Sequence, residues 1–287
     1  MRFRAIETDG REGVAGSRDG KSWRVLYQGD DGFPGLPDDF IQRGPTGIDA
    51  AAGALARGAP VGDIDQLKCL PPFRRASKIL CVGLNYAAHI KESGMPAPDY
   101  PTVFARFNSG LVGHGQPLIR PRSSDQFDYE SELAFIIGRR ARHVNEDRAL
   151  EYVAGYSIFN DGTIRDVQLR TPQWTIGKNF DGTGGFGPDF VTAEELPPGC
   201  DGLRMRGRHN GTVVQDTSLS DMVFGVRKLV AILSAAMTLD PGDVIATGTP
   251  SGVGLSFKPP RFLKPGDVFE IEIEKIGVLR NPVIAEA

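Results

Sequence analysis

The sequence predicts a β-rich α+β protein of 287 residues with a small N-terminal α/β domain. Runs with strand patterning outnumber helical runs, and the two kinds do not alternate one for one, which argues against a doubly wound parallel sheet. The chain is long enough for a sizeable core. Its content of 40% apolar and 24% charged residues is that of an ordinary globular protein.

The first stretch of the chain, residues 1–75, is predicted to be a small domain of short strands and loops. Asp-Gly pairs punctuate it with turns, and residues 22–28 between them form a strand-like run. Residues 47–58 are predicted to form a small helix. Residues 60–78 resemble a connector with paired prolines, so we place a boundary near residue 75 and assign residues 76–287 to a second domain.

More regular elements follow the connector. Residues 78–86 and 131–138 are apolar runs typical of buried strands. Residues 145–155 are predicted to form a short helix with Asn145 as its N-cap.

The C-terminal third is predicted to hold a longer helix, a strand and a hairpin. The helix follows Ser220 and ends where Pro241 and Gly242 interrupt it. Residues 243–250 form a strand that enters a Gly-rich loop, and residues 267–283 alternate as a strand and hairpin. The apolar positions that share one face of the helix are Leu229, Ile232, Leu233, Ala236 and Met237.

Charge and targeting signals argue against several function classes. A formal net charge of -3 gives no reason to expect nucleic acid or an anionic membrane as partner. The N-terminus lacks the apolar core of a secretory signal, and no apolar run is long enough to span a bilayer. The spacing of Cys69, Cys81 and Cys200 matches no disulfide or zinc pattern. We therefore expect a cytoplasmic protein that acts on a small molecule.

Acidic residues surround the start of the strand run at residues 131–138. Asp128, Glu130 and Glu132 share one face if this segment is extended. Adjacent half-buried carboxylates need a compensating cation, although a solvated strand edge also fits the pattern. Asp161 follows another apolar strand run and could complete an all-oxygen site for a hard divalent cation. Such a site would leave coordination positions open for water or substrate, as Mg²⁺ prefers.

Two Gly-rich segments, residues 182–188 and 247–254, do not predict a phosphate site. Neither contains G-x-G-x-x-G at the start of a helix, and neither has the lysine of a P-loop. Tight turns that bring backbone N–H groups near a bound carboxylate fit these segments better.

Six sequence blocks form an ordered set: GLNYAAHIKESG, LVGHGQPLIRP, FDYESELAFIIGR, FNDGTIRDVQ, GKNFDGTGGFGP and DVIATGTPSGVG. In this order they resemble the signature blocks of the fumarylacetoacetate hydrolase family. One block is a modest signal, whereas six in the same order are specific. The resemblance covers the chain from about Lys78 to its end. It implies that residues 76–287 form the β-rich mixed sheet or roll of the family's metal-dependent catalytic domain.

The resemblance implies a metal site and a catalytic dyad. Glu130, Glu132 and Asp161 match the residues that bind Mg²⁺ or Mn²⁺ in this family. His89 and Glu92 match a dyad that activates water, on a segment that becomes ordered when ligand binds. Chelation of a 2-oxo acid by the metal would polarise its carbonyl and stabilise an enolate, while His89 would act as the base.

Three further residues match positions that contact the oxo and carboxylate groups of the substrate. They are Lys178, Gln168 and Thr249, and Lys178 is expected to add positive charge where negative charge develops during catalysis. Arg165 and Asp166, in contrast, are expected to form a structural ion pair or a dimer contact. The remaining histidines, which lack such a context, are expected to be structural: His114, His143 and His209.

The sequence departs from the family pattern beside the expected site. Gly162 stands where the family often has serine or valine, and the loop at residues 182–188 differs from the usual T-x-G-P-x-G-P form. Both departures bear on the tail of the substrate more than on the metal. The N-terminal domain and the loop at residues 94–103 are expected to shape the pocket.

The intact dyad favours a Mg²⁺-dependent hydrolase that cleaves a C–C bond in a 2,4-dioxo acid of the acylpyruvate type. The alternative is an isomerase or decarboxylase of an unsaturated 2-oxo-diacid, or an oxaloacetate decarboxylase or tautomerase, since one enolate-stabilising centre serves all of these. A phosphoryl-transfer enzyme would need an Arg/Lys cradle that is not evident, and a scaffold protein would have lost a ligand or the dyad. Because family members are usually dimers or larger, we expect a homodimer.

Overall fold

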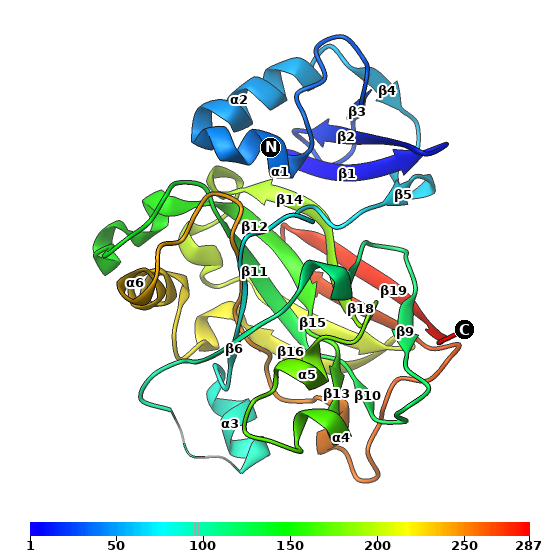
Figure 1. Ribbon diagram of the computed structural model, residues 1–287, viewed down its shortest axis with the longest axis vertical. Helices are drawn as coiled ribbons and strands as arrows, with labels where there is room; N and C mark the ends of the chain where they lie inside the picture. Colours follow the sequence, from blue (N-terminus) through cyan, green and yellow to red (C-terminus); the bar gives the residue numbers. More distant parts are fainter. Residues whose placement is uncertain (95, 97) are drawn as a thin grey trace.

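The computed structural model describes residues 1–94, 96 and 98–287 and confirms a β-rich α+β fold. One large mixed sheet runs through the molecule (Figure 1). Its strands, in spatial order, are β4 (Ala59–Val61), β3 (Trp23–Tyr27), β2 (Arg11–Ser17), β1 (Arg2–Thr8), β14 (Gly184–Thr192), β12 (Val153–Asn160), β11 (Ser131–Ile137), β17 (Val244–Ala246), β6 (Ile79–Gly83) and β7 (Thr102–Ala105). Two short strands join it at the side, β5 (Lys68–Cys69) on β1 and β8 (Leu111–Val112) on β14.

A second sheet contains the C-terminal hairpin. Its strands, in spatial order, are β16 (Thr212–Ser218), β15 (Arg204–His209), β18 (Val268–Ile273), β19 (Gly277–Ala285) and β9 (Leu118–Arg120). The antiparallel pairing of β18 with β19 confirms the hairpin predicted over residues 267–283. A separate two-stranded pair joins β10 (Phe127–Asp128) to β13 (Thr163–Ile164).

The N-terminal segment is continuous with the main sheet. β1 pairs antiparallel with β14, placing Phe3 opposite Phe190. The helices α1 (Pro37–Phe40) and α2 (Gly44–Leu55) lie beside these strands at one end of the molecule (Figure 1). The predicted strand at residues 22–28 and helix at residues 47–58 are confirmed as β3 and α2. Phe3 and Phe190 share one buried apolar cluster with side chains of both helices.

β11 is buried along its whole length and divides the core. Leu133, Phe135 and Ile137 join one apolar cluster, whereas Ala134 and Ile136 join the other. A strand buried on both faces reads as a continuous apolar run, which is why this segment shows no alternation in the sequence. The face of Ala134 and Ile136 also carries the acidic positions that precede them, so carboxylates at the start of β11 enter the protein interior.

Two helix predictions need correction. Residues 145–155 do not form one helix: Glu146–Tyr152 is a 3₁₀-helix, β12 starts at Val153, and the Asn145 side chain makes no capping bond. The predicted long helix is α6 (Val226–Ala236), which buries Leu229 and Leu233 but ends before Pro241. Ala236 lies exposed at its end, and Met237 lies beyond it. Each predicted helix is cut short because the residues after it pair with another segment. Val153 pairs with Ile137 of β11, and Leu239 pairs with Ala141.

Three short helices gather at the end of the molecule away from α1 and α2 (Figure 1). They are α3 (Ala87–Ser93), α4 (Arg165–Gln168) and α5 (Thr175–Lys178), and each carries residues that the sequence assigns to the site. The three cysteines are free and buried. Within the described ranges, no helix has the length and apolar character required to cross a membrane.

Candidate active site

Three buried carboxylates meet where β11 and β12 lie side by side. Glu130 directly precedes β11 and Asp161 directly follows β12, and the backbone N–H of Asp161 donates to the carbonyl of Glu130 at 3.0 Å. With Glu132 they offer oxygen atoms that all lie within 4.8 Å of one another. The structure therefore brings together the predicted metal ligands, because antiparallel pairing of the two strands aligns their ends.

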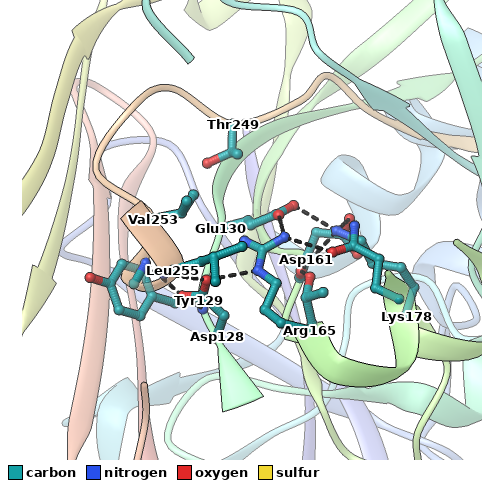
Figure 2. A network of polar contacts seen from close by, with 12 residues as sticks. Asp128, Tyr129, Glu130, Asp161, Arg165, Lys178, Thr249, Val253 and Leu255 are labelled. Atoms are coloured by element: carbon teal, nitrogen blue, oxygen red, sulfur yellow. Dashed lines mark hydrogen bonds and ion pairs between the residues drawn. The ribbon is translucent and has the colours of Figure 1, made fainter. Parts of the chain in front are cut away.

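Cationic side chains contact two of the three carboxylates (Figure 2). Lys178 Nζ lies 2.7 Å from Glu130 Oε2 and 2.6 Å from Asp161 Oδ2. Arg165 Nη1 lies 2.8 Å from Glu130 Oε1. Burial opposes ionisation of Glu130, yet Lys178 and Arg165 outweigh it and lower its pKa to about 2. Burial likewise opposes the charge on Lys178, but Asp161 and Glu130 raise its pKa.

Glu132 has no such cationic partner among the described residues. The backbone N–H of Gly248 donates to Glu132 Oε2 at 2.9 Å, and this is the hydrogen bond that its carboxylate receives. Burial, then the neighbouring charges of Asp161 and Glu130, raises the pKa of Glu132 well above its ordinary value. One carboxylate of the cluster is therefore left without compensation.

The charges of the cluster fit a divalent cation. In the described part of the chain, four buried carboxylates face three cationic side chains: Asp128, Glu130, Glu132 and Asp161 against Arg106, Arg165 and Lys178. An all-oxygen donor set with excess negative charge suits a hard cation such as Mg²⁺. The residues present therefore fit the metal that the sequence predicts.

Asp128 was expected to share one strand face with Glu130 and Glu132, but it contacts other groups. Its carboxylate accepts hydrogen bonds from Arg165 Nε at 2.7 Å and from the backbone N–H of Gly254 at 2.7 Å and Leu255 at 2.9 Å (Figure 2). The chain also leaves the extended path between β10 and β11. Asp128 thus anchors the Gly-rich loop and Arg165 beside the cluster.

A cavity of about 320 Å³ opens next to the carboxylates. Apolar side chains cover much of its wall, and Glu130 and Glu132 are among the polar groups that line it. A few placed polar groups in an apolar cleft are typical of a site for a small molecule. The lining residues are Val82, Gly83, Leu84, His89, Glu92, Phe104, Glu130, Glu132, Arg165, Gln168, Leu169, Trp174, Lys178, Thr249, Val253, Leu255 and Ser256.

The residues that line the cavity differ from one expectation, that the N-terminal domain helps to shape the pocket. The described lining residues all fall between Val82 and Ser256, so the N-terminal domain, which was expected to shape the pocket, supplies none of them. Phe104, directly after the loop at residues 94–103, does line the cavity. Residues 95 and 97 of that loop lie outside the described residues.

The predicted dyad forms part of the cavity wall. His89 and Glu92 lie on the short helix α3, where His89 Nδ1 is 3.3 Å from Glu92 Oε2. The backbone N–H of Gly252 donates to Glu92 Oε1 at 3.1 Å. Burial would raise the pKa of Glu92, but hydrogen bonds with His89, Ser256 and Gly252 lower it. Glu92 therefore stays ionised and orients the imidazole toward the cavity.

Arg165 lies in the same wall, next to the predicted substrate contact Gln168. Arg165 Nη1 donates to Gln168 Oε1 at 3.0 Å. Its Nη2 is buried and has no hydrogen-bond partner in the described structure. An ion pair between Arg165 and Asp166 does not form: Arg165 pairs with Asp128, and Asp166 accepts a hydrogen bond from Ser124. The free Nη2 makes Arg165 a candidate anion-binding group that the sequence did not single out.

Arg106 is a second residue that the sequence did not reveal. Its Nη1 lies 2.5 Å from Asp161 Oδ1 and also donates to the carbonyl of Gly162, while Nη2 donates to Thr183 Oγ1. A side chain at Gly162 would place Cβ 1.9 Å from the carbonyl oxygen of Thr183. The two departures from the family pattern therefore pack against each other, and Arg106 connects both to Asp161.

One of the two Gly-rich segments binds carboxylates, but those of the protein itself. In the segment at residues 247–254, backbone N–H groups donate to Glu132, Glu92 and Asp128. Most of the segment at residues 182–188 belongs to β14 rather than to a loop. The expected anion cradle is therefore internal support for the site.

A known protein family and several solved structures resemble this chain. The sequence pattern of the family described as "Fumarylacetoacetate (FAA) hydrolase C-terminal" matches residues 78–284. The fold, the carboxylate cluster and this match agree, and the chain belongs to the fumarylacetoacetate hydrolase family of enzymes. The predicted family and fold class are thereby confirmed.

Several similar proteins and solved structures have names that state an activity. Oxaloacetate tautomerase Fahd2a of Rattus norvegicus is 40% identical over 255 residues, covering 88% of this chain and 81% of the relative. The human oxaloacetate tautomerase FAHD2A is 39% identical, with coverage of 88% and 81%. Among solved structures, a fumarylacetoacetate hydrolase from Exiguobacterium antarcticum has a TM-score of 0.86 at 36% identity, covering both chains completely. A probable 2-hydroxyhepta-2,4-diene-1,7-dioate isomerase from Mycobacterium abscessus has a TM-score of 0.80 at 29% identity, again with complete coverage of both chains.

Proposed function

We propose that this protein interconverts the enol and keto forms of a small 2-oxo-diacid, with oxaloacetate as the first substrate to test. The observation that carries the proposal is that one cavity is lined both by two carboxylates of the buried acidic cluster, Glu130 and Glu132, and by a histidine that contacts Glu92. A tautomerase needs these two parts, one to stabilise the enolate and one to move a proton at carbon. Relatives named as oxaloacetate tautomerases support this choice over the others.

Glu130, Glu132 and Asp161 are the residues that would hold the divalent cation. When bound there, Mg²⁺ or Mn²⁺ would supply Lewis-acid polarisation of the 2-oxo group. Lys178 adds fixed positive charge beside the same carboxylates, and the unpaired Nη2 of Arg165 provides a donor for a substrate oxygen.

His89 is the proton-transfer group of this proposal. An imidazole exchanges protons near neutral pH, and His89 lines the cavity beside the carboxylate that orients it. In the direction from enol to keto, neutral His89 takes the proton of the enol oxygen and delivers a proton to C3 of the substrate, so that the imidazole ends neutral and ready for another turnover. The apolar wall formed by Phe104, Trp174 and Leu255 limits competing proton transfer with bulk water.

Hydrolysis of a C–C bond, which the sequence favoured, is the second candidate. The His89–Glu92 pair fits water activation, and one structural relative is named as a fumarylacetoacetate hydrolase. Hydrolysis also requires water at a second carbonyl, whereas tautomerisation requires only the proton transfer. The tautomerases among the relatives support isomerisation, which was the alternative in the sequence analysis, more than they support hydrolysis.

The test follows the decay of enol oxaloacetate by ultraviolet absorbance with Mg²⁺, and after treatment with EDTA. We expect wild-type protein to accelerate the decay, His89→Asn to lose most of this effect, and EDTA to abolish it. Parallel assays measure carbon dioxide release from oxaloacetate and acid release from an acylpyruvate. Acid release from the acylpyruvate, with no acceleration of enol decay beyond that of His89→Asn, would replace tautomerisation with hydrolysis.

A further inference from the structure

Gln215 is a buried polar residue next to the site that does not line the cavity. It lies on β16 and is 1% exposed, and β16 belongs to the second sheet rather than to the strands that carry the carboxylates. Burial of a carboxamide carries a free-energy cost unless its hydrogen bonds are made. The partners of Gln215 therefore indicate what it does.

Three of the four hydrogen-bonding sites of the Gln215 amide are used. Its Oε1 accepts from the backbone N–H of Ser131 at 3.0 Å. Its Nε2 donates to Thr249 Oγ1 at 2.8 Å and to the carbonyl of Pro250 at 3.0 Å. Rotating the amide by half a turn would set two donors against each other at Ser131 and two acceptors against each other at Pro250. The partners therefore determine the orientation of the amide.

The packing around Gln215 leaves little freedom for another arrangement. A Cβ on Gly207 would lie 2.4 Å from Ser131 Oγ and 3.1 Å from Gln215 Oε1. A Cβ on Gly252 would lie 1.9 Å from the carbonyl oxygen of Val214. Strand β15 and the Gly-rich loop thus approach the side chain closely, which holds it in one position.

The fixed Gln215 amide determines which hydrogen bonds Thr249 can make. Its hydroxyl oxygen accepts a hydrogen bond from Gln215, so one of its lone pairs is occupied from the protein side. Among the described residues, none accepts the hydroxyl proton, and Thr249 lines the cavity. The hydroxyl proton is therefore available to a ligand, and Thr249 is set to act as a donor to an oxygen that carries negative charge.

We propose that Gln215 is a positioning residue that presets the Thr249 hydroxyl as a hydrogen-bond donor for an anionic oxygen of the ligand. The link to Ser131, between Glu130 and Glu132, ties this donor to the strand that carries the metal ligands. The donor and the carboxylate cluster are thus held at a constant separation. The inference rests on the proposed function only for the class of ligand, a 2-oxo acid.

The test measures binding of oxalate by calorimetry at saturating Mg²⁺. We expect Gln215→Met and Thr249→Val each to weaken oxalate about tenfold, the effect of losing a hydrogen bond to a charged group. The double variant should bind no more weakly than Thr249→Val alone, because both changes remove the same donor. Additive losses in the double variant, or unchanged oxalate affinity in Gln215→Met, would overturn the proposal.

Two controls separate positioning from general damage. Gln42→Met makes the same chemical change at an exposed glutamine that donates to the carbonyl of Pro241, and it should leave oxalate affinity unchanged. The affinity for Mg²⁺ alone should also stay within about twofold in Gln215→Met. Loss of Mg²⁺ binding in parallel with oxalate binding would mean that the site has collapsed, which contradicts a role confined to Thr249.

A second variant gives a pH-dependent readout and serves if Gln215→Met does not fold. In Gln215→Glu the introduced carboxylate accepts the Thr249 proton at neutral pH, so oxalate binding should weaken. Its protonated form can donate to Thr249 again, so affinity relative to wild type should recover as the pH falls. A pH-independent ratio would contradict the proposal, as would wild-type protein that fails to bind millimolar oxalate. Oxalate binding without tautomerase activity would instead refute the proposed function alone.

Discussion

At the scale of single residues, the carboxylates of the site differ in what compensates their charge. Glu130 and Asp161 contact cationic side chains, whereas Glu132 receives a backbone hydrogen bond and no cation among the described residues. Its raised pKa reflects burial first and then the charges of Asp161 and Glu130. Glu132 therefore opposes folding when no metal is bound and favours binding of a cation when one is present.

We predict that Glu132→Gln stabilises the protein in EDTA. Removing an uncompensated buried charge should raise the free energy of unfolding by about 1–3 kcal/mol. The same change should abolish the stabilisation that Mg²⁺ gives to wild-type protein, because a metal ligand is lost. Urea unfolding of both proteins with EDTA and with Mg²⁺ measures the effect. Lower stability of the variant in EDTA would show that Glu132 is already compensated.

A second residue-scale prediction concerns acid stability at Asp267. Its carboxylate accepts hydrogen bonds from Asn210 Nδ2 at 2.8 Å and the backbone N–H of Lys264 at 2.8 Å, and His209 Nε2 lies 2.9 Å away. Burial would raise its pKa, but these contacts lower it below the ordinary value of 3.8. The ionised group is thus favoured by folding, so its contribution is present above pH 3.8 and is lost as the pH falls toward the folded pKa.

The measurement compares wild type with Asp267→Asn by urea unfolding between pH 7 and pH 3. We expect the variant to be less stable by about 1 kcal/mol near pH 7, where hydrogen bonds to a charge are lost. The difference should shrink as wild-type Asp267 becomes protonated. A difference that does not depend on pH would assign the effect to packing instead.

At the scale of elements, the side chain of Glu92 joins α3 to the Gly-rich loop at residues 247–254. Glu92 accepts from the backbone N–H of Gly252 and contacts His89 on its own helix. A helix of seven residues has little stability by itself, so such a contact matters for its position. Glu92 therefore both places α3 over the cavity and orients the imidazole.

Two variants of Glu92 separate these roles. We predict that Glu92→Gln, which keeps an acceptor for Gly252, lowers kcat about 10- to 100-fold through loss of the charge beside His89. Glu92→Ala should lower kcat at least as much and should also speed hydrogen exchange across residues 87–94. Global stability should change little in either variant. Equal exchange rates in the two variants would argue that Glu92 does not hold α3.

At the scale of the whole molecule, the main sheet extends from the N-terminal segment into the catalytic core. β1 pairs with β14, and Arg4 Nε donates to Asp189 Oδ1 at 2.7 Å with both side chains buried. Phe3 and Phe190 contribute to the same apolar cluster. Separation of the segment would expose this cluster to water, at a cost of about 25 cal/mol per Å² of apolar surface.

We predict that the two segments unfold together, which also tests the boundary placed near residue 75. Trp23 lies on β3 in the N-terminal segment, and Trp174 lines the cavity, so each reports on a different part. In Trp23→Phe and Trp174→Phe, the remaining tryptophan should give the same urea midpoint once the stability change of each substitution is corrected by circular dichroism. Corrected fluorescence midpoints that differ between the two variants would mean that residues 1–75 unfold as an independent domain.

The homodimer stays a prediction that rests on the family. A single chain has a mass of 31.0 kDa, so light scattering distinguishes one copy from two directly. We expect a mass twice that of the chain at micromolar concentration. A mass of one chain would contradict the expectation.

The fold class, several strands and the candidate carboxylates could be predicted from the sequence because they depend on local pattern and spacing, whereas the His89–Glu92 dyad was predicted from the resemblance to the family. Alternation identified the hairpin of β18 and β19, and an apolar run identified β11. The helix at residues 145–155 was predicted wrongly, because pairing with β11 makes residues 153–155 part of strand β12 and leaves only a 3₁₀-helix before it.

The sequence by itself determined that this protein has a carboxylate site beside a His-Glu pair on a β-rich scaffold. Only the tertiary structure decided which cations and amides surround that site. Arg106, Arg165 and Gln215 bond to groups 55, 37 and 84 residues away in the chain, on other strands and loops. No local pattern carries such information, because a buried polar group is defined by the partners that the fold brings to it.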